Sequence, residues 1–286
     1  MRPSTKPPKP PSPSGLETQH LESARECSTW NVRRGDSMCS TWNVSIPTPP
    51  PDNPSAAGEE PPYGEAPKAL AASLQALGLE VAPEDRDRLL ELARMLIVWG
   101  RATNLTGHRD VSGAVQHLVV GALALHQAIE GQIGAFRSGG FADLGSGAGF
   151  PGIPIATVHS GLSAVLVESR EKRHHFQRAV RRELGVDNIE PRWGRMEVLA
   201  PSPVRWVIAQ AVAAPSRVLG WAMDWVEPGG FLVIPGGPKP PEPGSHPLMA
   251  ESGVAEYSVP SIPSGRSLWW CQRSGGGKSG SRVGSA

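Results

Sequence analysis

The amino-acid sequence predicts an α/β protein built on a mostly parallel, doubly wound sheet. From about residue 139 onward, short apolar runs that suit buried strands alternate with amphipathic helical segments. The first of these runs leads directly into a glycine-rich turn, as a strand does at the ligand-binding edge of such a sheet. The sequence therefore predicts a ligand site at the carboxyl ends of the strands.

Composition limits the classes of function. The 286 residues carry 28 basic and 27 acidic side chains, so any nucleic-acid surface must be a local patch. Three scattered cysteines suit neither a disulfide framework nor a metal-binding knuckle. No apolar run approaches the roughly 18 residues of a membrane span, and the N-terminus lacks the apolar run of a secretory signal. We expect a cytoplasmic protein without a metal site or a membrane segment, and its oligomeric state stays open.

The chain divides near residue 68. Fourteen of the 30 prolines lie in residues 1–67, which lack a periodic apolar pattern and are predicted to be a disordered, Pro-rich extension. This segment repeats Cys27–Val32 as Cys39–Val44, and codons for the repeat can spell the palindrome GTTCCACGTGGAAC. That palindrome resembles bacterial chromosome-partition sites, so we interpret the repeat as DNA-level information read in frame. A pair of linear peptide motifs and a meaningless duplication are the alternatives.

A helical N-terminal cap is expected over about residues 68–135. Pro83 suits the first turn of a helix, and Leu89, Leu92, Ala93 and Leu96 then recur on one face. A second apolar helical stretch runs over residues 111–123.

The core is expected over about residues 139–273, followed by a disordered Gly/Ser-rich tail over residues 274–286. Strands are predicted at Phe141–Leu144, Ala164–Val167, near Ile189, at Trp206–Ala209, Phe231–Ile234, Val254–Val259 and Leu268–Cys271. Helices are predicted at Lys172–Leu184, ended by Gly185, and at Ser216–Val226, ended by Pro228-Gly229. We expect most of the six tryptophans from Trp193 to Trp270 to pack in the core.

The segment from Phe141 to Gly152 is the most informative. Its glycines fit two overlapping patterns, the Gly-x-Gly-x-x-Gly fingerprint of a dinucleotide site and the Asp-x-Gly-x-Gly-x-Gly motif of S-adenosylmethionine methyltransferases. Asp143 at the strand end favours the second pattern, because it can reach the amino acid part of that cofactor. Pro151 and Pro154 also favour it, since each removes an amide that a pyrophosphate would use.

Glu168 ends the next predicted strand, nineteen residues beyond Gly149. A carboxylate at this place can accept hydrogen bonds from both hydroxyls of a ribose. The spacing therefore favours a nucleoside-containing cofactor.

The ordered set of motifs resembles the ribosomal RNA small-subunit methyltransferase G family, also called glucose-inhibited division protein B. The matching segments are Asn104–Thr106 with Arg109-Asp110, Asp143–Pro154, Glu168-Ser169 with Lys172-Arg173 and Phe176, and Gly194–Glu197. The resemblance covers residues 68–273 and implies a Rossmann-like S-adenosylmethionine-dependent methyltransferase fold. It also implies N7-methylation of a guanine in 16S ribosomal RNA, either free or in the small ribosomal subunit.

The motifs, their spacing and the resemblance together give the candidate site residues. Cofactor-binding residues are expected at Asp143, Gly145, Gly147, Gly149, Phe150, Glu168, Met196, Glu197 and Gln210. Substrate-side candidates are Asn104, Arg109, His117, Arg195 and Arg266. Four positions depart from the family pattern, where Gln116, Val120, Gln210 and Pro235 replace Arg, Asp, Arg and Lys.

The expected reaction needs no general base, because guanine N7 carries a lone pair and no proton. We therefore assign no catalytic base, and interpret His117 as a structural histidine first. Basic residues from Arg170 to Arg182 are predicted to attract RNA phosphates, with a solvated charged face as the alternative. Three functional alternatives remain: a cofactor-binding member with impaired catalysis, a nicotinamide-dependent oxidoreductase, and a methyltransferase for small molecules or proteins.

Overall fold

The computed structural model describes residues 62–136, 139–260 and 262–275. Residues 1–61 and 276–286, and with them the Cys27–Val32 repeat and most of the predicted tail, lie outside the described residues. The first helix begins at Ala66, two residues before the boundary predicted from composition. None of the helices in the described part of the chain has the length and apolar character of a membrane span.

Four helical segments precede the sheet. These are α1 (Ala66–Ala76), α2 (Pro83–Thr103), α3 (Val111–Ala114) and α4 (Val120–Gln132), with a π-helical turn at Val115–Val119 between the last two. Pro83 opens α2 and Asn104, with φ of +52°, ends it in the left-handed conformation. The carboxylate of Asp110 caps α3 by accepting a hydrogen bond from the Gly113 amide at 2.7 Å.

A seven-stranded sheet follows, in the order β3-β2-β1-β4-β5-β7-β6. The strands are β1 (Gly139–Leu144), β2 (Leu162–Glu168), β3 (Ile189–Trp193), β4 (Val204–Ile208), β5 (Val226–Gly236), β6 (Met249–Val259) and β7 (Ile262–Arg273). The strands β1 to β5 pair with one another in parallel, whereas β7 runs antiparallel to both β5 and β6. This confirms the mostly parallel, doubly wound sheet and adds an antiparallel hairpin at one edge.

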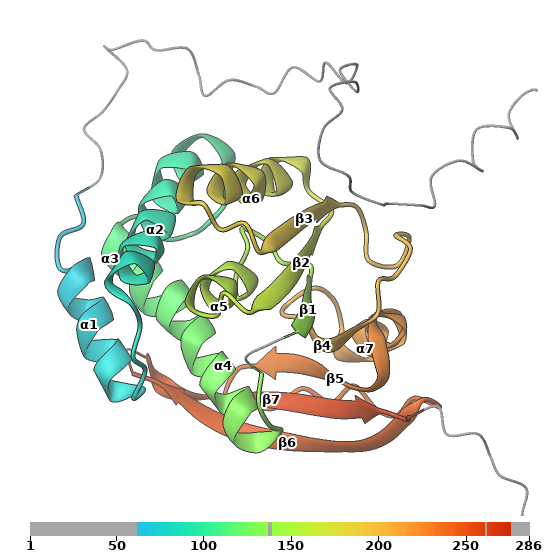
Figure 1. The fold of residues 1–286 in the computed structure, drawn as a ribbon. Coiled ribbons are helices and arrows are strands. Elements are labelled where there is room, and N and C mark those ends of the chain that lie inside the picture. Colours follow the sequence, from blue (N-terminus) through green and yellow to red (C-terminus); the bar gives the residue numbers. More distant parts are fainter. Residues whose placement is uncertain (1–61, 137–138, 261, 276–286) are drawn as a thin grey trace, which may run out of the picture. The chain divides into compact units, whose positions relative to one another are not determined.

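Both faces of the sheet are covered (Figure 1). Alternate residues along β4 separate into two cores: Trp206 and Ile208 pack with the cap helices, α5 (Gly152–Val158) and α6 (Glu171–Leu184). Val207 and Ala209 pack on the other face with α7 (Pro215–Ala222). Side chains of successive strand residues point to opposite faces, which explains why these strands read as continuous apolar runs.

Two predicted helices differ from the structure. The stretch over residues 111–123 contains the π-helical turn rather than one regular helix. The helix predicted at Ser216–Val226 ends at Ala222, a 3-10 turn covers Met223–Trp225, and β5 has already begun at Val226. Pro228-Gly229 is therefore not the helix end but part of an irregular stretch of β5, because Val226 pairs with Val204 while Phe231 pairs with Trp206.

Candidate active site

The glycine-rich turn connects β1 to α5 at the carboxyl edge of the sheet. The amides of Gly145 and Ser146 donate to the Val167 carbonyl at 2.8 and 3.0 Å, which ties the turn to β2. In the strand order, β1 lies between β2 and β4, at the point where the chain changes direction across the sheet. Ligands of open α/β sheets bind at this place.

The glycines of the turn serve two purposes. A Cβ at Gly145 would lie 2.5 Å from the Val212 side chain, and Cβ atoms at Gly149 and Gly152 would collide with Ile153 and Leu166. These three glycines make room for protein. At Gly147, with φ of +60°, the nearest atom to an added Cβ would be Nη1 of Arg173 at 3.7 Å. Of these four glycines, Gly147 is the one where an added Cβ would meet no atom closer than an ordinary van der Waals contact.

Glu168 joins the turn to the end of β2. It is 4% exposed, and its carboxylate accepts hydrogen bonds from the amides of Gly147 at 2.9 Å and Arg170 at 2.7 Å. The guanidinium of Arg173 lies 3.8 Å from the same carboxylate. Glu168 is therefore fixed beside the open Gly147, as a residue that receives ligand hydroxyls must be.

Asp143 lies beneath the turn. Its Oδ2 accepts a hydrogen bond from the Gly152 amide at 2.9 Å, while Oδ1 is buried without a partner among the described residues. Burial raises the pKa of this carboxyl from 3.8 to about 7; the Gly152 hydrogen bond opposes the rise and the charge of Glu168 adds to it. The unpaired oxygen is the polar group here that a cationic ligand, or water bound with it, would complement.

Sequence reasoning missed Gln177, which supports the turn from α6. This fully buried side chain donates from Nε2 to the Ser146 hydroxyl and to the Gly147 carbonyl, both at 2.8 Å. Because Glu168 accepts a hydrogen bond from the Gly147 amide, both the amide and the carbonyl of Gly147 are hydrogen-bonded. The sequence did offer a sign of this role, because Gln177 is a polar side chain on the apolar side of the helix, beside Phe176 and Val180.

The segment after β3 lies next to Glu168. The Gly194 amide donates to the Glu168 carbonyl at 2.9 Å, which brings Gly194–Glu197 to the site. Met196 is buried, and its carbonyl accepts from the Trp225 indole at 3.2 Å. Glu197 forms an ion pair with Arg195. Desolvation acts to raise the pKa of Glu197, but a hydrogen bond from its own backbone amide, together with Arg195, outweighs this effect and lowers the pKa.

Trp193 departs from the expectation of core packing. It is 57% exposed at the end of β3, and its indole donates to the Ser169 carbonyl at 3.1 Å. Trp206, Trp225 and Trp269 are buried as expected. The α6 residues beside it also match the predicted charge pattern, since Arg170, Lys172, Arg178, Arg181 and Arg182 are exposed while Arg173 turns toward Glu168.

The ends of β4 and β5 carry two departures from the family pattern. Gln210 is exposed just after β4, two residues before the Val212 side chain that packs on Gly145. Pro235 lies in β5 opposite Leu268. The amide of Ala209, just after β4, donates to the Val233 carbonyl of β5. The nitrogen of Pro235, two residues further along β5, faces the same side. It lies beyond Ile208, the last β4 residue that pairs with β5. No ladder hydrogen bond is lost there.

The cap contributes the remaining departures and candidates. Gln116 and His117 lie in the π-helical turn, a geometry often found at functional sites. His117 is exposed, and its ring centroid lies 5.1 Å from that of His108. Its Nδ1 lies 3.0 Å from the Gly113 carbonyl. Asn104 and Arg109 are exposed, whereas Val120 is fully buried in the cap core.

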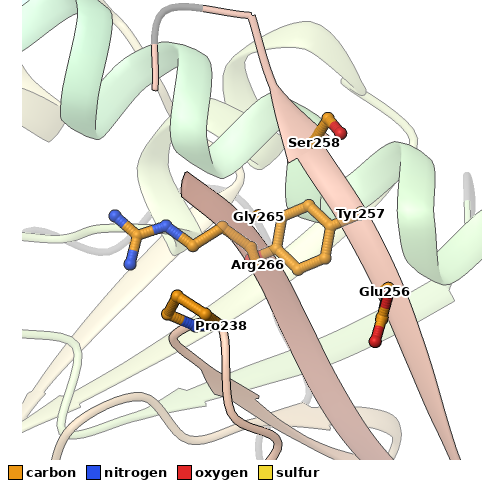
Figure 2. Close-up of a pocket in the computed structure, with 6 residues that line it drawn as sticks. All are labelled: Pro238, Glu256, Tyr257, Ser258, Gly265 and Arg266. Carbon is orange, nitrogen blue, oxygen red and sulfur yellow. The ribbon is translucent and has the colours of Figure 1, made fainter. Parts of the chain in front are cut away.

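Arg266 lies apart from the glycine turn, on β7. It lines a pocket with Pro238, Glu256, Tyr257, Ser258 and Gly265 (Figure 2). The structure thus groups the cofactor-side residues from Asp143 to Gln210 along the ends of β1 to β4 and places Arg266 beyond the end of β5.

Comparisons with known proteins identify the family of this chain. The family model described as rRNA small subunit methyltransferase G matches residues 85–259. Ribosomal RNA small subunit methyltransferase G of Azoarcus sp. (strain BH72) is 33% identical over 198 residues, which is 68% of this chain and 83% of that protein. The same enzyme of Ralstonia nicotianae is 30% identical over 210 residues, 70% of this chain and 92% of that protein.

Among solved structures, geranyl diphosphate methyltransferase in complex with GPP and sinefungin has a TM-score of 0.44 and 12% identity, with 68% of this chain and 100% of that chain covered. The family model extends from α2 to the end of β6 and includes the glycine turn and the ends of β1 to β4. The chain therefore belongs to the rRNA small subunit methyltransferase G family.

Proposed function

We propose that this protein methylates N7 of a guanine in 16S ribosomal RNA, with the RNA or the small ribosomal subunit as its partner. As a member of its family, the chain is an S-adenosylmethionine-dependent rRNA methyltransferase. The observation that carries the assignment to this site is the open Gly147 beside a fixed Glu168 and an unpaired Asp143 oxygen. The nicotinamide-dependent alternative is wrong for a member of this family.

The residues around the turn fit S-adenosylmethionine, which supplies a methyl group on a positively charged sulfur. In our proposal Glu168 accepts hydrogen bonds from the ribose hydroxyls, and Gly147 lets the cofactor approach the backbone. Asp143 holds the turn through Gly152 and presents Oδ1 toward the cofactor's ammonium, directly or through water. Gly145, Gly149 and Phe150 shape the turn, while Met196, Glu197 and Gln210 border the site.

The protein's task in this reaction is alignment. As the lone pair of guanine N7 forms a bond to the methyl carbon, the carbon–sulfur bond breaks and its electron pair stays on sulfur. No proton moves, so no side chain has to act as a base. Rigid positioning and exclusion of water supply the rate enhancement. The hydrogen bonds of Gln177 and Glu168 to Gly147 provide that rigidity on the cofactor side.

On the RNA side, the proposal assigns contacts to residues exposed around the site. Asn104, Arg109 and His117 present polar groups from the cap, and Arg195 does so from the segment after β3. Exposed basic residues of α6 would attract phosphates, and Trp193 offers a ring on which an unpaired base can stack.

Calorimetry and methyl transfer together test the proposal. The purified chain is titrated with S-adenosylhomocysteine and with NAD, and is then given S-adenosylmethionine labelled in the methyl group and small ribosomal subunits. We expect binding of S-adenosylhomocysteine but not of NAD, and label in the RNA that Glu168→Ala abolishes. Binding without transfer would instead support the impaired-catalysis alternative, which the substitutions at Gln116, Val120, Gln210 and Pro235 motivate.

A further inference from the structure

A pocket lies beyond the carboxyl end of β5, outside the cofactor site. Its volume is about 340 Å³, and it is lined by Pro238 on one side and by the β6–β7 hairpin on the other (Figure 2). Small-molecule sites start at about 300 Å³, so the pocket can hold a group the size of one nucleotide.

The pocket has a fixed frame. The Ser267 hydroxyl donates to the Gly237 carbonyl at 2.7 Å, which ties β7 to the loop that carries Pro238. Tyr257 and Arg266 face each other in the register of β6 and β7. Tyr257 also packs against the main core, and its burial raises the pKa of its phenol to about 12, so the hydroxyl remains protonated.

The side chain of Arg266 is the feature of this pocket that indicates a bound ligand. This side chain is half-buried, yet within the described ranges it makes no hydrogen bond or ion pair. Other half-buried arginines do have partners: Arg94 bonds to Glu91, Arg192 to Glu190, and Arg273 to backbone carbonyls. A partly desolvated guanidinium without a partner suits a phosphate, which it can bind through two parallel hydrogen bonds.

The other walls suit the rest of a nucleotide. Figure 2 shows the guanidinium of Arg266 and the carboxylate of Glu256 directed to opposite sides of the pocket, with the Tyr257 ring between them. A phosphate would be repelled at the Glu256 side. A carboxylate and the Ser258 hydroxyl can instead accept hydrogen bonds from base N–H groups or from a ribose 2′-hydroxyl.

The position of the pocket relative to the glycine turn also suits a nucleotide next to the reacting guanosine. It lies at the same edge of the sheet as the glycine turn, since Gly236 at the end of β5 pairs with Ser267 next to Arg266. With neighbouring strands about 4.8 Å apart, β7 lies about 10 Å from β4 and about 14 Å from β1. This is too far for the reacting guanine and suitable for a nearby nucleotide of the same RNA strand.

We infer that this pocket binds a nucleotide flanking the target guanosine, with its phosphate on Arg266 and its base or ribose between Tyr257 and Glu256. The inference rests on the proposed function and deepens it. The subsite holds the strand on one side of the reacting base, and it contributes affinity for RNA without touching the cofactor.

Salt dependence of RNA binding tests the phosphate contact. The full chain is titrated with a short fluorescein-labelled single-stranded RNA over a series of salt concentrations, as wild type, Arg266→Ala, Arg266→Lys and Lys239→Ala. Removing one phosphate contact should weaken RNA binding about tenfold and make the slope of log K against log salt shallower by about 0.7. Arg266→Lys should lose less RNA affinity than Arg266→Ala, because lysine keeps the positive charge. It should still bind more weakly than wild type, because lysine lacks the planar guanidinium.

Lys239→Ala is the matched control, because Lys239 is an exposed cation in the same loop as Pro238, paired with Glu242. It should keep wild-type values. Tyr257→Phe should also bind RNA normally, whereas Tyr257→Leu, with circular dichroism to check its fold, should bind weakly. Affinity for S-adenosylhomocysteine should be the same in all variants.

Distinct outcomes overturn the subsite and the proposed function. If wild type methylates the RNA but Arg266→Ala keeps its affinity and salt slope, only the subsite is wrong. Equal losses of RNA affinity in Arg266→Ala and Lys239→Ala would mean that Arg266 acts only through its positive charge and that the pocket is not a specific site. A selective loss of S-adenosylhomocysteine binding would assign Arg266 to the cofactor. A wild-type chain that neither binds nor methylates RNA overturns both proposals.

Discussion

Among single residues, the four glycines Gly145, Gly147, Gly149 and Gly152 differ in what an added Cβ would meet. The sequence motif identified their turn, the strand before it and the acid at the strand end. It could not say which of these glycines lie against protein, because that depends on how the Ile153 side chain is directed and on Val212 and Leu166, which come from elsewhere in the fold. Only the structure distinguishes Gly147 from its neighbours.

Gly147→Ala should abolish or strongly weaken S-adenosylhomocysteine binding, because its Cβ occupies space meant for the ligand. The matched control is Gly185→Ala at the end of α6, where φ is +63° and nothing lies within 4 Å of an added Cβ. Both variants adopt a left-handed backbone and should lose about 1 kcal/mol of stability. Calorimetry and thermal melting check both; equal affinities in the two variants would mean that Gly147 does not face the cofactor.

The raised pKa of Asp143 should make the stability of the folded protein depend on pH. This pKa is raised from 3.8 to about 7 by burial, so between these pH values the folded protein keeps a proton that the unfolded chain has lost. This contribution to stability is complete below pH 4 and disappears as the pH rises through about 7. Asp143→Asn should lack that part of the pH dependence in thermal melts from pH 5 to 8. An unchanged pH profile in the variant would assign the effect to another group.

Gln210→Arg should tighten S-adenosylhomocysteine binding, because a guanidinium at the end of β4 could form a charge-assisted hydrogen bond with the cofactor. The gain should be on the order of 1 kcal/mol, and less if solvent screens this exposed position. Titration of both proteins at equal salt measures it. Equal or weaker binding would show that the site has adapted to glutamine.

At the element scale, α6 combines two faces with different tasks. Its outer face carries the arginines that the sequence predicted, and its inner face carries Gln177, which the sequence analysis overlooked. The sequence pattern predicted all seven strands and the helices α2, α6 and α7, but not α1 or α5. It also failed at the π-helical turn and at the end of α7, because both depend on local backbone geometry rather than on the spacing of apolar residues.

Gln177→Leu tests the inner face of α6. It keeps the approximate volume but leaves the Ser146 hydroxyl and the Gly147 carbonyl without this donor, which should cost about 1–3 kcal/mol of stability. The looser turn should also bind S-adenosylhomocysteine more weakly. Arg181→Ala on the exposed face serves as the control and should change neither the melting temperature nor this affinity. Normal cofactor binding by Gln177→Leu would exclude a positioning role for Gln177.

At the scale of the whole molecule, the sequence predicted the α/β class but not the strand order. Pairing of β7 between β5 and β6 joins residues far apart in the chain, and no local pattern encodes it. The same long-range pairing brings Arg266 next to Tyr257 and forms the pocket beyond β5. The sequence offered Arg266 only as one of several substrate-side candidates, whereas its lack of a partner among the described residues became visible only in the fold.

The proposed methyl transfer to N7 of a guanine is tested most directly in the small-subunit RNA itself. 7-Methylguanosine is mapped, by chemical cleavage of the RNA, in a strain that lacks the gene and in the same strain with the gene restored. We expect one guanine in 16S RNA that loses its N7-methyl group in the deletion and regains it with wild type but not with Glu168→Ala. An identical 7-methylguanosine pattern in the deletion and the restored strain would contradict the claim.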